Sequence, residues 1–85
     1  MNAVTYAVLA VLALEAGHPH EAEDHVRAAQ HHSRSTARRE RQLVEIAALV
    51  VRGERDRARG LSFEHATEFP EDDALLSSFF RADAR

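Results

Sequence analysis

The chain has 85 residues, enough for one domain with a small hydrophobic core. Hydrophobic residues make up 45% and charged residues 29%, and the formal net charge of -3 argues against a dedicated nucleic-acid-binding protein. The sequence contains no cysteine, which excludes disulfides and thiolate metal sites.

The apolar opening predicts a first helix over residues 2–16. Its uninterrupted run from Ala3 to Leu14 is shorter than the roughly 20 residues that span a bilayer. No basic residue precedes the run, as one would in a secretory signal. We therefore expect a buried helix, no membrane association and a cytoplasmic location.

A glycine and a proline separate this helix from the next. Gly17 can adopt the left-handed conformation that ends a helix, and Pro19 suits the first turn of a new one. Ala22, Val26 and Ala29 form a narrow apolar stripe, so the sequence predicts a second helix over residues 19–32.

The third and fourth helices follow the same plan. Hydroxyl residues at 33–36 are expected to cap a helix over residues 36–52, whose apolar residues recur at helical spacing until Gly53. A fourth helix over 54–69 has its inner face marked by Ala58, Leu61, Phe69 and either His65 or Ala66, with Phe63 to one side.

Pro70 ends the fourth helix and introduces a terminal one. Residues 71–73 are acidic, which suits the positive N-terminal end of a helix over about 71–82, and we expect them to be solvated. Phe79 and Phe80 are adjacent in this helix, so only one of them can be well buried. The fold class predicted from these elements is all-α.

The two glycine turns suggest an internal repeat. Gly17 is followed by Ala22 and Gly53 by Ala58, each alanine five residues on, and the two copies lie 36 residues apart. The sequence predicts two stacked antiparallel hairpins in a single domain, with units at about 2–34 and 36–70 and then the terminal helix.

This rhythm resembles the tetratricopeptide repeat family. The first unit carries the resemblance through Tyr6, Leu9, Ala10, Gly17, Ala22, Val26 and Ala29, and the second through Gly53, Ala58 and Pro70. The second departs from it with Gln42 and Glu45 in its first helix. Residues 36–42, 53, 57–58 and 68–72 are similar to bacterial relatives of tetratricopeptide repeat protein 38, which are longer α-solenoids. The resemblance implies a slice of an α-solenoid.

No group of residues predicts catalysis, a cofactor or a metal site. The sequence has six histidines, but no two of the five between residues 18 and 32 have the i,i+4 spacing of helical ligand pairs. We expect them to be surface or capping residues. The serines lack a glycine-flanked elbow, and there is no glycine-rich phosphate loop.

Four arginines gather near the start of the third helix: Arg34, Arg38, Arg39 and Arg41. They could form a solvated face with internal pairs such as Arg41–Glu45, or dock against acidic residues, including the chain's own at 64–73. They could also bind an anion at the helix N-terminus.

Two functional hypotheses follow from these patterns. The first is a non-catalytic protein-interaction or assembly module, because about three stacked repeats are usually needed to cover a solenoid core. The excess apolar surface, including Phe79 or Phe80, then predicts association with another protein or with itself, most simply as a two-fold dimer. The alternative is a regulator that binds an anion or nucleic acid through the arginine cluster.

Overall fold

In a computed structural model of the chain, residues 1–81 are described and form helices without a strand. The elements are α1 (Ala3–Glu15), α2 (Pro19–Ser33), α3 (Arg38–Val51), α4 (Arg55–Glu68), the 3₁₀ helix η1 (Pro70–Asp72) and α5 (Asp73–Phe79). The expected all-α class is confirmed. Among these residues no helix has both the length and the apolar character needed to cross a membrane.

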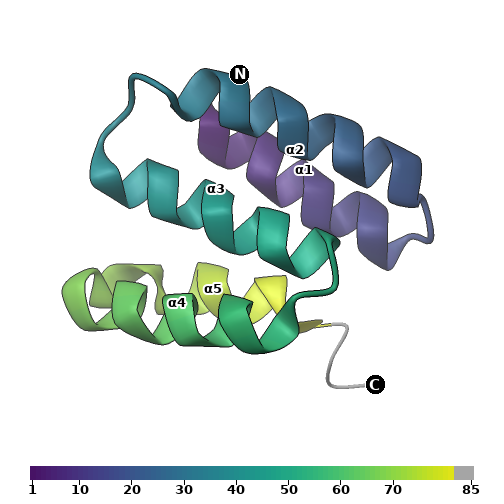
Figure 1. The fold of residues 1–85 in the computed structure, drawn as a ribbon. Helices are drawn as coiled ribbons and strands as arrows, with labels where there is room; N and C mark the ends of the chain where they lie inside the picture. The colour runs from purple at the N-terminus through teal and green to yellow at the C-terminus, as the bar shows by residue number, and fades with distance from the viewer. Residues whose placement is uncertain (82–85) are drawn as a thin grey trace.

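The helices form two layers (Figure 1). Helices α2, α3 and α4 lie side by side at the front, with α1 behind α2 and α3, and α5 behind α4. Helix α3 is central, because it contacts α1, α2, α4 and α5. It supplies four residues to the main core cluster, Leu43, Val44, Ile46 and Ala47, which pack with residues of α1, α2 and α5.

The corners that close the two hairpins have the same backbone geometry. Gly17 and Gly53 have φ angles of 83° and 79°, the left-handed region that favours glycine. At the first corner the N–H of Gly17 donates to the Leu14 carbonyl at 3.0 Å, and that of His18 to the Ala13 carbonyl at 2.9 Å.

The second corner repeats both bonds 36 residues later. The N–H of Gly53 donates to the Val50 carbonyl at 3.2 Å, and that of Glu54 to the Leu49 carbonyl at 2.9 Å. Both corners are therefore Schellman motifs, which satisfy carbonyls that the helix end leaves unpaired. The alanines five residues after each glycine, Ala22 and Ala58, are both fully buried.

The start of α3 differs from the expectation. The helix begins at Arg38 rather than at residue 36, and its N-cap, Ala37, provides no side-chain hydrogen bond. The Thr36 hydroxyl instead donates to the Ser33 carbonyl at 2.8 Å, and the Ser33 hydroxyl to the Gln30 carbonyl at 3.1 Å. The hydroxyl groups thus satisfy the end of α2 and leave α3 uncapped.

The C-terminal helix is shorter than expected. Helix α5 ends at Phe79, and residue 82, the predicted end, lies outside the described residues. Phe79 is almost fully buried in the main core, whereas Phe80 is partly exposed. The prediction that only one of the two phenylalanines is well buried is confirmed.

Candidate interaction surfaces

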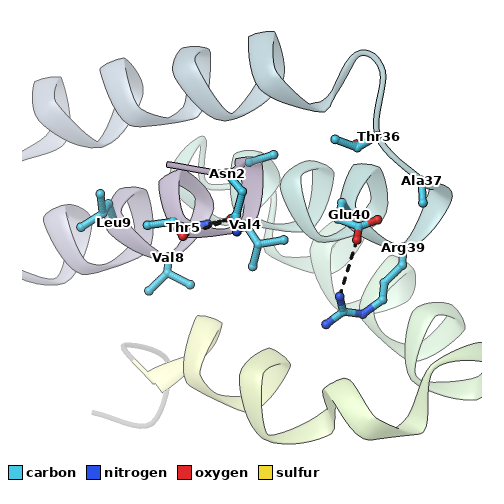
Figure 2. A pocket seen from close by; sticks show the side chains of 10 residues that line it. Asn2, Val4, Thr5, Val8, Leu9, Thr36, Ala37, Arg39 and Glu40 are labelled. Atoms are coloured by element: carbon cyan, nitrogen blue, oxygen red, sulfur yellow. Dashed lines mark hydrogen bonds and ion pairs between the residues drawn. The ribbon is translucent and has the colours of Figure 1, made fainter.

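An open groove lies between the N-terminal halves of α1 and α3 (Figure 2). Its volume is about 670 Å³. Its lining includes Val4, Thr5, Val8 and Leu9 from α1 and Arg39 and Glu40 from α3. The groove is apolar because α1 is apolar on nearly every side, and its buried alanines already provide the contacts with the other helices.

Arg39 and Glu40 bring charge to one side of this groove. Arg39 Nη1 lies 3.8 Å from Glu40 Oε1, as the dashed line in Figure 2 marks. Glu40 Oε2 is buried without a hydrogen-bond partner among the described residues. A groove with an apolar lining and few polar groups is a common form of binding surface.

Behind the groove, Arg39 contacts Asp72, as one of the alternatives for the arginine cluster predicted, within a network whose other members, Gln42 and His65, the sequence did not place there. Its Nε donates to Asp72 Oδ2 at 2.8 Å and its Nη2 to Asp72 Oδ1 at 2.6 Å. His65 Nε2 lies 2.7 Å from the same Oδ2, and His65 Nδ1 lies 2.7 Å from Gln42 Oε1. We call these four residues, Arg39, Gln42, His65 and Asp72, the polar clasp.

Two members of the polar clasp, His65 and Asp72, are held out of water, whereas Arg39 has 37% of its side chain exposed. The His65 side chain has 0% and the Asp72 side chain 4% of its surface exposed. A carboxylate can only accept hydrogen bonds, so His65 Nε2 carries a proton and donates a hydrogen bond to Asp72 Oδ2. The two hydrogen bonds from Arg39 lower the pKa of Asp72 most, His65 lowers it further, and burial opposes both. Asp72 in turn raises the pKa of Arg39.

Two expectations are corrected by the polar clasp. Asp72 is not a solvated carboxylate at a helix start, and His65 is not a surface or capping histidine. The signal for His65 was its position on the inner face of the fourth helix, in register with Ala58, because a buried histidine needs hydrogen-bonding partners. A histidine–aspartate pair can serve in catalysis, but this one is inaccessible to a substrate and joins α3, α4 and η1.

Two further arginines of the cluster, Arg38 and Arg41, also contact nearby protein groups. Arg38 Nη1 lies 2.9 Å from Glu68 Oε1, although both side chains are well exposed. Arg41 donates to the Thr36 carbonyl, and not to Glu45 as one alternative had it. Arg34 is exposed. The structure therefore brings two of the four arginines, Arg38 and Arg39, against the chain's own acidic residues.

A second apolar surface lies on α4 and α5, and we call it the end face. A hollow of about 330 Å³ there is lined by Arg59, Phe63, Ala66, Asp73, Leu76 and Phe80, among others. Phe63 has 78% of its surface exposed at this hollow. The Arg59 guanidinium lies over the Phe80 ring, 5.6 Å from its centroid.

Three histidines of α2 make ring contacts, either with Tyr6 of α1 or with one another. The His32 ring stacks on the Tyr6 ring with centroids 5.1 Å apart, and His25 lies at 6.4 Å from the same ring. His31 meets His32 edge-on at 5.5 Å. No group of three or more metal-ligating side chains comes together within residues 1–81.

Comparison with known proteins adds no relative: no family model matches the chain, and neither a curated protein nor a solved structure is significantly similar to it. The resemblance to tetratricopeptide repeats therefore depends on the residues of this chain alone.

Proposed function

We propose that the chain is a non-catalytic, helical-repeat module that acts by protein–protein association, and that a second copy of the chain is its first partner. The observation that carries the proposal is the exposure of large apolar side chains on α1 and α4, which two hairpins and one short helix leave uncovered. Phe63 is 78% exposed and Leu12 is 47% exposed.

The distribution of polar groups supports a role without catalysis. His65 and Asp72, the buried ionisable groups of the polar clasp, contact other helices and are shielded from a substrate. The open groove has an apolar wall and one neighbouring pair of opposite charges, Arg39 and Glu40. Surfaces of this kind are typical of interaction sites.

The repeated corners support the helical-repeat part of the proposal. Each helical repeat buries its hydrophobic face on its neighbours, so two repeats leave apolar surface at the ends of the stack. A tetratricopeptide-like family membership and a cytoplasmic location are parts of the same proposal. The alternative, anion or nucleic-acid binding by the arginine cluster, has less support because Arg38 and Arg39 already contact carboxylates.

Light scattering after size-exclusion chromatography, with sedimentation velocity, tests the proposal. We expect a reversible monomer–dimer equilibrium that shifts with concentration across the micromolar range and changes little with salt, because apolar contacts dominate it. A folded chain that stays monomeric over this range would contradict the proposal. Irreversible growth of larger species would indicate aggregation and would also contradict it.

A further inference from the structure

We propose that the end face is a two-fold, self-complementary dimer surface, in which Phe63 of each copy enters the hollow between α4 and α5 of the other copy. This inference depends on the proposed function, because it names the surface through which the chain would associate with itself. It does not involve the groove between α1 and α3.

The first argument is shape. The end face carries a projecting aromatic side chain, Phe63, beside a hollow of about 330 Å³ whose lining includes Ala66, Leu76 and Phe80. A two-fold interface uses the same patch on both copies, so the patch must contain both a projection and a matching recess. A phenylalanine that becomes buried removes about 150–250 Å² from water, the size of contribution that anchors interfaces.

The second argument is charge, which selects one orientation of the two copies. Arg59 lies over Phe80 and so marks one end of the hollow, near the end of α5. Asp73 begins α5, which follows α4 after only the short η1, so it marks the opposite end. Figure 1 shows α5 running back along α4.

A dimer with the two α4 helices antiparallel therefore brings Arg59 of one copy to the end that holds Asp73 of the other. A parallel arrangement would place the two Arg59 residues at the same end, where like charges repel. The antiparallel arrangement also forms the favourable pair twice, because the two-fold axis repeats it.

The size of the end face predicts a weak dimer. Helix α4 has 14 residues and α5 has 7, so they are about 21 and 10 Å long, and each is about 10 Å wide. Such a face covers roughly 300 Å² in projection on each copy, which is below a standard specific interface and in the range of weak, transient contacts. We therefore expect a weak, reversible dimer in which the loss of one anchor is easily measured.

Sedimentation equilibrium of the whole chain and two matched variants tests the surface. Phe63→Arg should raise the dimer dissociation constant at least about tenfold. His20→Arg, which places the same side chain at an exposed position of α2 away from the end face, should leave it within about twofold. Circular dichroism should show unchanged helix content in both, because each side chain is already substantially exposed.

A charge exchange tests the orientation. Arg59→Glu and Asp73→Arg should each weaken the dimer, and the double variant should restore most of the loss, because the pair re-forms across the axis with its signs reversed. Without restoration in a correctly folded double variant, the antiparallel arrangement would be wrong.

The two proposals fail in different ways. A dimer that Phe63→Arg leaves intact would overturn the end-face assignment while self-association stood. A wild-type chain that stays monomeric at every concentration would overturn both.

Discussion

The two hairpins share one corner geometry but are held together by different chemistry. In the α1–α2 hairpin, small side chains let the helices approach closely, and the buried residues include Ala3, Ala7, Ala10, Ala22, Val26 and Ala29. In contrast, α4 buries only Ala58 and His65. The same local turn signal therefore specifies how a hairpin closes, but not what keeps its second helix in place.

The polar clasp explains how a helix as polar as α4 stays on the core. Helix α4 buries few apolar side chains, and burying His65 would destabilise the fold if the histidine had no hydrogen-bonding partners. Gln42 and Arg39 from α3 and Asp72 from η1 supply these contacts, directly or through Asp72. We infer that the first hairpin is stabilised mainly by packing and the second mainly by a hydrogen-bonded ion pair, a difference that three measurements can test.

The largest loss of folding stability is expected when the ion pair of Arg39 with Asp72 is removed. Asp72→Ala leaves the buried His65 and the partly exposed Arg39 without their shared acceptor, and a buried donor left unsatisfied in this way costs about 1–3 kcal/mol. For a domain of this size each kcal/mol lowers Tm by about 4–8 °C. Thermal unfolding followed by circular dichroism measures the loss.

The neighbouring residue provides the control for this variant. Glu71 is exposed on the same 3₁₀ helix, and Glu71→Ala should change the free energy of unfolding by no more than about 0.5 kcal/mol. Equal Tm values for the two variants would show that the polar clasp contributes little to stability.

A smaller loss of folding stability is expected when acid protonates Asp72. Because the pKa of Asp72 is lower in the folded than in the unfolded chain, its stabilisation is complete above the unfolded value of about 3.9 and is lost as pH falls through the folded pKa. One group can change the free energy of unfolding by at most about 1.4 kcal/mol per pH unit.

Chemical denaturation at a series of pH values below 5 isolates this contribution when wild type is compared with Asp72→Asn. The stability difference between them should shrink as the pH falls below about 4. The comparison is needed because Glu23, whose pKa is lowered mainly by its hydrogen bond from Arg52, contributes in the same direction. A difference that is constant with pH would contradict the ionic role of Asp72.

The smallest loss of folding stability is expected at the glycine corners, which are the feature that the two hairpins share. Gly17→Ala and Gly53→Ala each place a side chain in the left-handed region, at a cost of about 1 kcal/mol. An added Cβ meets no atom within 4 Å at either corner, so backbone conformation alone sets the cost. We expect equal losses in urea denaturation, and clearly unequal losses would mean that the corners are not equivalent.

The candidate surfaces were only partly predictable. The pattern of residues predicted more apolar surface than the chain can bury. It also predicted that only one of the two adjacent phenylalanines would be well buried. The exposed position of Phe63 was not predicted, because the sequence placed it only beside the inner face of its helix. Docking of the arginine cluster against the acidic residues at 64–73 was one of three alternatives, but the contact of Arg39 with Asp72 joins residues 33 positions apart, and no local pattern selects that pair.

The sequence by itself determined the helices and their corners, because apolar spacing, glycine conformation and proline act over a few neighbouring residues. Only the tertiary structure decided which polar groups entered the core and which apolar groups stayed outside. That choice depends on how α3, α4 and η1 meet in space. Each buried donor or acceptor must find its partner there, and the free energy of each pairing is a property of the assembled helices.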